Sequence, residues 1–232
     1  MINHKNRYAM KQHVNILFIF ILPLFLNPFL SVSQTGSLKD IDGNVYKTVK
    51  IGTQIWMAEN LRTTKYIDGA SIPKVVDTSA WKNLTKPAYC WYNNDAPKYK
   101  KRCGALYNAY VLNTHKLCPT GWHIPSDAEW TKLINYLGTP DDAGGKMKST
   151  DLAWENPNTG ATNESGFSAL PSGIRGLNGT FHSIDSTAYF WSSSEGGSFA
   201  AYIRHVDYNS SACKKGISFY KQVGFSIRCV KD

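Results

Sequence analysis

The stretch CPTGWHIPSDAEWTKLINYLG, from Cys118 to Gly138, contains the clearest helix signal in this chain. Ser126 and Glu129 have the spacing of a capping box, in which a serine hydroxyl and a glutamate carboxylate satisfy backbone N–H groups at the start of a helix. Gly138 is the residue type that ends helices in a left-handed conformation. Between them, apolar side chains recur every three or four positions and form one stripe on a helix of about three turns: Trp130, Leu133, Ile134 and Leu137. We therefore expect an amphipathic helix packed against a core that the rest of the chain builds.

The first 33 residues have the order of a secretory signal peptide. Basic residues precede an apolar run at 16–30, and small residues follow up to Ser33, which predicts cleavage after that serine. Two prolines and an asparagine interrupt the run and leave it short of the roughly 20 residues that a membrane anchor needs. We therefore expect a Sec-type signal peptide over 1–33 and one domain over 34–232. The protein is then secreted, periplasmic or on the cell surface, with no membrane span after cleavage.

The charge of the expected mature chain is moderately basic. Without the signal peptide, 23 basic residues face 17 acidic ones, and the densest basic cluster is Lys98–Arg102. A solvated loop is the simplest explanation of such a cluster, and export removes nucleic acid as a routine partner. Acidic glycans and envelope phosphates remain as partners that this charge would attract.

The five cysteines, Cys90, Cys103, Cys118, Cys213 and Cys229, all lie in the expected mature chain. In an oxidising compartment they are best interpreted as disulfide material, and their odd number leaves at least one unpaired. Their spacing does not match zinc-binding motifs. A Cys118–Cys229 bond would tie the start of the helix to the last strand. A Cys90–Cys103 bond is the second pairing that we consider, and it leaves Cys213 over.

The remaining pattern indicates an α+β fold with one domain, because helix signals come early and short strands late. We expect a hairpin of strands at 45–51 and 54–57, a buried aromatic strand or turn at 89–92, and a helix at 106–112. A long polar region follows at 139–165. Further strands, bounded by Gly, Ser or Asn, are expected at 166–170, 189–193, 200–206, 216–221 and 224–230, with the last three as an antiparallel set.

Several motifs, in the same order along the chain, resemble the Fibrobacter succinogenes major paralogous domain. They are IGTQIWMAENL (51–61), YCWYNND (89–95), CPTGWHIPSDAEW (118–130), GGKMK (144–148), NTGATNESGFSALP (158–171), FWSSSE (190–195) and GFSIRCVKD (224–232). This family occurs in secreted and surface-attached bacterial proteins and has no settled activity. The resemblance implies a C-type lectin-like fold, with twisted antiparallel sheets, two flanking helices, adjacent termini and long loops that carry any ligand site.

The resemblance does not imply catalysis. The similar formylglycine-generating enzymes bind copper through a close pair of cysteines near the C-terminus, whereas Cys213 and Cys229 are 16 positions apart here. We also expect Cys229 to be consumed by its bond to Cys118. The histidines are scattered without metal-binding spacing, and the serines at 192–194 lack a nucleophile elbow. We therefore expect no catalytic residue, no metal ligand and no cofactor.

One segment favours sugar binding. Trp154, Glu155, Asn156 and Asn158 lie in the long polar region, where calcium-dependent lectins place a Glu-Pro-Asn motif. An extra Asn interrupts the motif here, so calcium, which favours such oxygen ligands, is an alternative to a metal-free site. Ring stacking on sugars is expected of loop aromatics, namely Trp154, Trp81, Tyr99 and Tyr208, although most aromatics must be core.

These observations lead to two hypotheses of different class. The first is a secreted or cell-surface, non-catalytic binding module with glycans, extracellular or of the cell wall, as partners. The alternative is a structural or adhesive envelope protein without a small ligand. A formylglycine-generating-type oxidase is the third and least favoured reading, because the cysteine pair is not matched.

Overall fold

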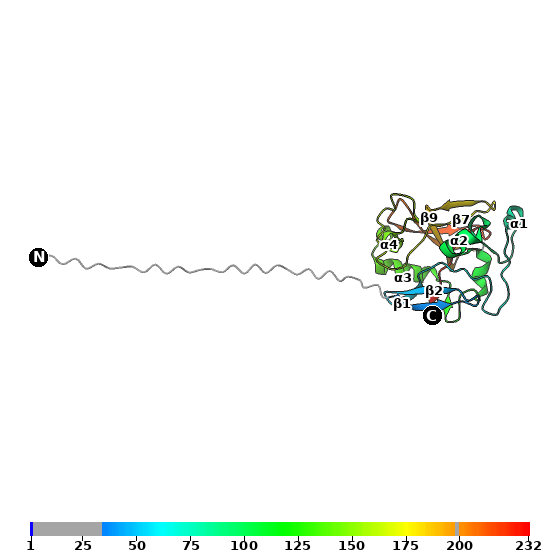
Figure 1. The fold of residues 1–232 in the computed structure, drawn as a ribbon, viewed down its shortest axis with the longest axis horizontal. Helices are drawn as coiled ribbons and strands as arrows, with labels where there is room; N and C mark the ends of the chain where they lie inside the picture. Colours follow the sequence, from blue (N-terminus) through cyan, green and yellow to red (C-terminus); the bar gives the residue numbers. More distant parts are fainter. Residues whose placement is uncertain (2–33, 198–199) are drawn as a thin grey trace.

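A computed structural model of the chain describes residue 1 and residues 34–197 and 200–232 (Figure 1). The expected signal peptide over 1–33 lies outside the described residues, apart from Met1. Within the described part, no helix has both the length and the apolar character needed to cross a membrane.

The smaller sheet has five strands in the order β1-β2-β3-β13-β6. Its strands are β1 (Gln34–Lys39), β2 (Val45–Ile51), β3 (Gln54–Met57), β6 (Trp122–His123) and β13 (Val230–Lys231). All pairings are antiparallel, and β2 and β3 form the expected hairpin. The first described strand and the last strand therefore belong to the same sheet.

The larger sheet has the order β11-β10-β9-β7-β12-β5-β4, with β8 paired to β7. Its pairings are antiparallel except for the parallel pair β7 and β9. Figure 1 places β7 and β9 at one end of the molecule and β1 and β2 at the other. Its strands are β4 (Tyr89–Cys90), β5 (Leu106–Asn108), β7 (Ser172–Arg175), β8 (Phe181–Ile184), β9 (Thr187–Gly197), β10 (Ala200–Asp207), β11 (Cys213–Ser218) and β12 (Gly224–Phe225).

The helices are α1 (Thr78–Lys82), α2 (Ala96–Cys103), α3 (Asp127–Leu137) and α4 (Pro140–Met147), with 3-10 helices η1 (Tyr92–Asn94) and η2 (Ala109–Thr114). The expected capping box is present at α3, where the Glu129 N–H donates to the Ser126 hydroxyl at 3.3 Å and the Ser126 N–H donates to the Glu129 carboxylate at 2.8 Å. The mixture of helix and largely antiparallel sheet confirms the α+β class.

Three local predictions were wrong: the helix at 106–112, the strand at 166–170 and the place of the last expected strand in the antiparallel set. Residues 106–112 form strand β5 and the start of η2, because β5 pairs with both β12 and β4. The polar region at 139–165 begins with helix α4, whose Pro140 stands at the first turn. Strands β10 and β11 form an antiparallel pair as expected for 200–206 and 216–221, but β12 does not join them, since it pairs with β5 and β7. At 166–170, the structure has only a bridge between Lys148 and Ala169.

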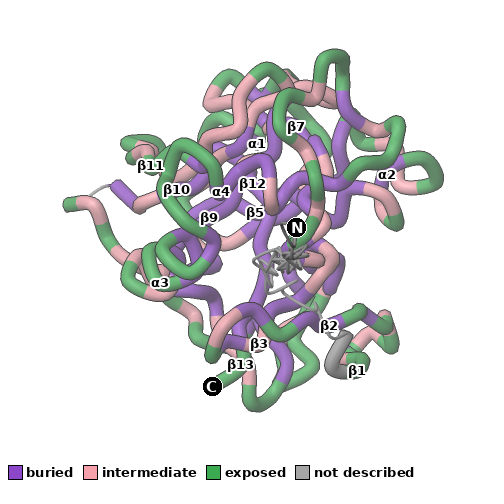
Figure 2. The backbone as a smooth tube through the Cα atoms, turned by 90° about the vertical axis from the view of Figure 1, so that its left-hand side faces the viewer, coloured by how far each residue is buried: buried purple, intermediate pink, exposed green. Residues whose placement is uncertain are grey.

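The apolar stripe of α3 packs as expected. Its side chains Trp130, Leu133, Ile134 and Leu137 are all buried. The Trp130 ring lies 4.8 Å from that of Trp56 on β3, 5.8 Å from Phe167 and 5.5 Å from Phe190 on β9, measured between centroids. Helix α3 thereby joins the two sheets through one aromatic cluster. Figure 2 shows the buried backbone running through β9, β12 and β5.

Of the two disulfide bonds that we considered, one is present in the structure. Cys118 and Cys229 form a disulfide with a Cα–Cα distance of 6.0 Å, beside the β6–β13 pair. The Cys90–Cys103 pairing is wrong, because both side chains are free thiols. Cys90 lies on β4 and Cys103 ends α2, and burial raises the pKa of each to about 12, so both stay protonated. Cys213 is also free, as expected.

Buried cations hold the irregular segments of the fold. Arg175 on β7 donates to the carbonyls of Val75, Val76 and Gly179, at 2.6, 2.8 and 3.0 Å, while its guanidinium stacks 4.4 Å from the Trp81 ring. A buried carbonyl without a hydrogen-bond partner lowers the stability of the fold. The Arg175 bonds supply that partner for carbonyls that lie outside the named strands.

Two more buried cations act in the same way. Arg228, which precedes the disulfide, donates to the carbonyls of Phe167 and Ser168 and to the Asn60 side chain. Lys148 follows α4, is fully buried, and donates to three carbonyls at 2.9 Å each, those of Thr159, Asp207 and Ser210. Burial lowers the pKa of Lys148 to about 8, so the ammonium that makes these bonds is present at neutral pH.

We expect Lys148→Met to destabilise the fold far more than Lys146→Met. The first change removes a buried ammonium that holds three partly buried carbonyls, which costs about 3 kcal/mol. Lys146 is partly exposed and pairs with Glu164 at 3.2 Å, so its loss costs less than about 1 kcal/mol. Urea unfolding of both variants measures the difference. Equal midpoints would show that Lys148 does not hold these carbonyls in solution.

Candidate functional site

A cleft of about 470 Å³ lies between α3, α4 and the β10–β11 pair. Helix α4 contacts both α3 and β11. Gly144 allows the approach of α4, because a Cβ there would lie 2.2 Å from the carbonyl oxygen of Ala212. The residues lining the cleft are Thr131, Ile134, Asn135, Pro140, Asp141, Arg204, His205, Ala212, Cys213, Lys214 and Lys215.

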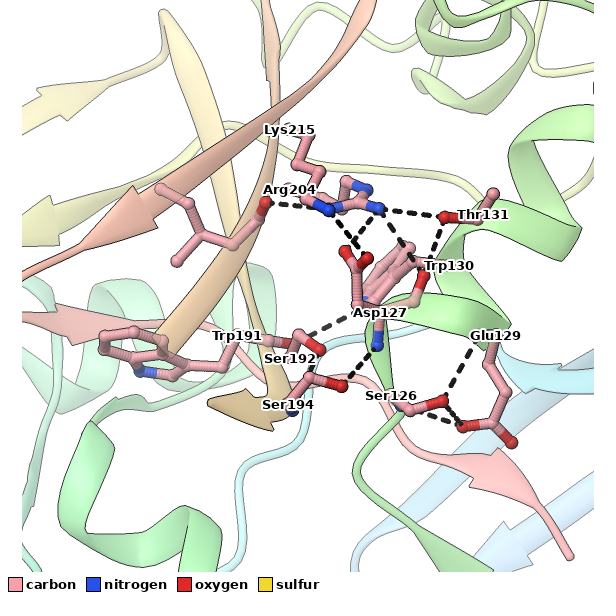
Figure 3. Close-up of polar contacts among 11 residues, drawn as sticks. Ser126, Asp127, Glu129, Trp130, Thr131, Trp191, Ser192, Ser194, Arg204 and Lys215 are labelled. Atoms are coloured by element: carbon pink, nitrogen blue, oxygen red, sulfur yellow. Dashed lines mark hydrogen bonds and ion pairs between the residues drawn. The ribbon is translucent and has the colours of Figure 1, made fainter. Parts of the chain in front are cut away.

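One wall of the cleft carries a carboxylate shared by two cations (Figure 3). Asp127, at the first turn of α3, pairs with Arg204 of β10 at 2.6 Å and with Lys215 of β11 at 2.8 Å. Arg204 also donates to the Thr131 hydroxyl at 3.2 Å. Burial raises the pKa of Asp127, but the Lys215 and Arg204 charges outweigh it and hold that pKa below its usual value. Two positive charges thus face one negative charge, and Lys215 is the more exposed of the two cations.

A second ion pair lies beside the first. Lys214 pairs with Asp207 at 3.1 Å, and the same carboxylate lies 3.7 Å from Nε2 of His205. Burial lowers the pKa of His205 despite that carboxylate, which favours the neutral ring at pH 7. Nδ1 of His205 and Nε of Arg204 are buried and have no hydrogen-bond partner among the described residues. Alternation along β10 puts the two side chains on opposite faces of the sheet, Arg204 toward α3 and His205 against the Tyr189 ring, so only the Arg204 Nε lies on the side of the cleft that faces α3.

The rest of the cleft is apolar or of opposite charge. Ile134, Ala212 and Cys213 contribute apolar atoms, and burial raises the pKa of the Cys213 thiol to about 12, so it is not a thiolate. Pro140 and Asp141, at the start of α4, form the facing rim. Cationic groups are thus confined to the β10–β11 wall, and a carboxylate lies on the α4 side.

A smaller cavity of about 190 Å³ lies against the disulfide, with Cys118, His115, His123 and Ser193 in its lining. His123 is held between two carboxylates, with Nδ1 2.6 Å from Asp232 and Nε2 2.7 Å from Glu129. Burial lowers the pKa of His123, but the bonds to Asp232 and Glu129 outweigh it and raise that pKa above the usual value. The histidine therefore joins the C-terminal residue to the capping box of α3.

The structure places Trp154 in the core and not on an open loop. The side chain is 6% exposed, and its indole N–H donates to the Ala169 carbonyl at 3.0 Å. The Lys148 ammonium lies 5.5 Å from its ring centre. The prediction of a sugar-stacking platform at Trp154 was wrong for this reason, and Trp81 and Tyr99 are buried as well.

The other expected ligand residues lie near Trp154 but outside the cleft lining. Glu155 and Asn156 are exposed, and Asn158 is half-buried. The Asn158 amide donates to the Ser149 carbonyl at 3.1 Å, while its Oδ1 is buried and has no partner among the described residues. No grouping of three or more His, Cys, Asp or Glu side chains suited to a metal ion occurs in the described part of the chain.

Sequence reasoning missed the cleft because its parts lie far apart in the chain. The nearest signal was Lys214-Lys215, which follow Cys213 and directly precede the strand expected at 216–221. The serines at 192–194 have structural roles, since Ser192 is buried and the Ser194 hydroxyl accepts from the Asp127 N–H at 2.9 Å.

Comparison with known proteins identifies the family. Residues 49–231 match the family model of the Fibrobacter succinogenes major domain, and the chain therefore belongs to that family. Neither the curated proteins nor the solved structures gave a match.

We expect the stabilising effect of His123 to depend on pH. Its folded-state pKa is raised above the unfolded value of roughly 6.5, so the stabilisation is fully present below that pH and is lost as pH rises through the folded pKa. On the acid side it persists while Glu129 stays ionised; burial raises the pKa of Glu129, but its bonds to Ser126 and His123 lower it further. The melting temperature of His123→Gln should therefore fall below wild type in mildly acidic buffer and converge with it in alkaline buffer.

The matched control is His115→Gln, at an exposed position beside the same cavity. Its melting curve should follow wild type at every pH. A constant deficit of His123→Gln across the whole range would show that the ring acts by packing and not by charge.

Proposed function

We propose that this member of the Fibrobacter succinogenes major domain family is a non-catalytic binding module that acts outside the cytoplasm, and that a glycan binds in the cleft between α3, α4 and β10–β11. The observation that carries the proposal is the cleft itself. It combines apolar atoms from Ile134 and Ala212 with hydrogen-bonding groups of Asn135 and Thr131, and small-molecule sites have this composition.

The chemistry of the wall supports binding over catalysis. The charged groups of Arg204, Lys214 and Lys215 are each engaged in an ion pair, and the Cys213 thiol is protonated. A formylglycine-generating-type oxidase would need Cys213 and Cys229 as a pair of copper-binding thiols, but Cys229 is bonded to Cys118. Groups engaged in this way can position a ligand, and the cysteines here offer no thiolate nucleophile.

We also propose that the fold is C-type lectin-like. Three features support it: largely antiparallel sheets, helices α3 and α4 at one side, and the sharing of one sheet by β1 and β13 (Figure 1). The chain between α4 and β7 has no strand or helix of its own in the structure, and it is held by Lys148 and Arg228. In such a fold, a rigid core presents irregular segments to a ligand. Export rests on the signal-peptide pattern at 1–33.

Asn135→Trp should abolish ligand binding without unfolding the protein. Asn135 is exposed on α3 and lines the cleft, so an indole there fills the space that the ligand would take. Lys132→Trp is the matched control, because it adds the same side chain to the same helix but lines a different cavity. The measurement is a glycan array with purified protein, with and without calcium, and thermal melts check folding.

We expect at least a tenfold loss of binding for Asn135→Trp and none for Lys132→Trp. Equal binding by both variants would place the ligand elsewhere. Binding that requires calcium would instead indicate a site at Glu155, Asn156 and Asn158. Association with cell walls that shows no glycan preference and is insensitive to Asn135→Trp would favour the structural, adhesive alternative.

A further inference from the structure

We propose that the ligand is an acidic polysaccharide, and that its chain continues from the cleft along the outer face of β11 onto Ile217, Phe219 and Tyr220. The inference rests on the proposed function, because it names the ligand class and the extent of the same site. Three independent observations support it: the register of β10 and β11, the distribution of charge, and a group of exposed apolar side chains.

The register places a continuous row of side chains beside the cleft. Lys215 pairs with Arg204, and Ile217 pairs with Tyr202. Because side chains alternate along strands, these four lie on one face of the sheet, the face on which Arg204 meets Asp127 of α3. The Lys215 ammonium lies 4.0 Å from the centre of the Tyr202 ring, which joins the charged wall of the cleft to the next part of the row.

The charges on this face favour an anion. Asp127 carries one negative charge against the two positive charges of Arg204 and Lys215, and the Lys215 side chain is 48% exposed. Lys214, which pairs with His205 in the register, lies on the opposite face and does not add to this charge. The α4 side of the cleft carries Asp141, which repels an anion. An acidic chain is therefore directed toward β11 and away from α4.

The row ends in the exposed apolar group. Ile217, Phe219 and Tyr220 have relative exposures of 39%, 67% and 55%, so three apolar side chains within four positions face solvent. Such groups often mark interaction sites. Rings of this kind suit sugars, whose C–H faces pack on an aromatic body while hydroxyls stay in water. At roughly 3.3 Å per strand residue, Lys215 and the end of β11 at Ser218 lie roughly 10 Å apart, farther than one monosaccharide reaches.

The observations favour a polysaccharide over a lipid surface. A membrane would need the apolar group alone, with cations around it, whereas here the cationic groups continue inward to a cleft lined by Asn135 and Thr131. A flat bilayer does not enter a cleft, but a chain bearing carboxylates and hydroxyls does.

The test uses polygalacturonate and alginate together with their methyl esters, which keep the sugar backbone but lose the charge. Affinity electrophoresis of the purified protein at increasing salt measures retention. We expect retention by at least one acidic polymer that weakens with salt and disappears on esterification. Lys215→Met and Phe219→Ala should each lower the affinity about fivefold to tenfold.

The matched controls are Lys132→Met and Tyr136→Ala, which remove one lysine and one exposed ring that line a separate cavity. Both should bind like wild type, and thermal melts verify that all variants fold. Binding that falls for Asn135→Trp but not for Phe219→Ala would overturn the extension along β11.

Two other outcomes separate this inference from the proposed function. Equal retention by the acid and the ester, still lost on Asn135→Trp, would overturn the acidic ligand and keep the cleft as a glycan site. Binding to anionic lipid vesicles with no retention by either polymer would overturn the inference in favour of a lipid surface. No binding to any polymer, vesicle or arrayed glycan would overturn both proposals.

Discussion

Hydrogen bonds from buried cations to backbone carbonyls are the interaction on which most of this structure depends. Arg175, Arg228 and Lys148 lie in the interior, and each donates to backbone carbonyls of irregular segments, Lys148 also to the last residue of β10. A chain with such long irregular stretches can bury them only when the carbonyls find donors. Guanidinium and ammonium groups are suited to this because one side chain satisfies several acceptors at once.

Arg204 differs from these cations in a way that explains the cleft. It is as buried as the others, but its main partner is the Asp127 carboxylate, which Lys215 also contacts from the solvent side. Elsewhere a buried cation holds irregular segments through their carbonyls. Arg204 instead places a positive charge, and an Nε without a hydrogen-bond partner, at the edge of a cavity. The site is therefore built by the rigid parts of the fold, namely α3, α4 and two paired strands, and not by the loop at 154–158.

The sequence predicted what local patterns specify. The capping box at Ser126, the stripe from Trp130 to Leu137 and the β2–β3 hairpin are encoded by residues a few positions apart, and the structure contains all three. The cleft could not be predicted, because it requires α3, α4 and β11 to meet. The prediction that Trp154 is exposed was wrong for a related reason. Its neighbours in the sequence are polar, which indicates exposure, but in the structure the indole contacts Ala169 and Lys148, and no local pattern reveals those contacts.

The disulfide has a consequence for how the protein matures. The 111-residue separation of Cys118 and Cys229 encloses α3, α4 and the strands from β7 to β12 in one covalent loop. Closing a loop of that length restricts the unfolded chain by roughly 4–5 kcal/mol in the chain-entropy model. Since the free energy of unfolding of a native protein is only about 5–15 kcal/mol, formation of this disulfide contributes a large share of it. The protein therefore reaches its full stability only after an oxidant has formed the disulfide, so its surroundings, as well as its sequence, determine when it becomes stable.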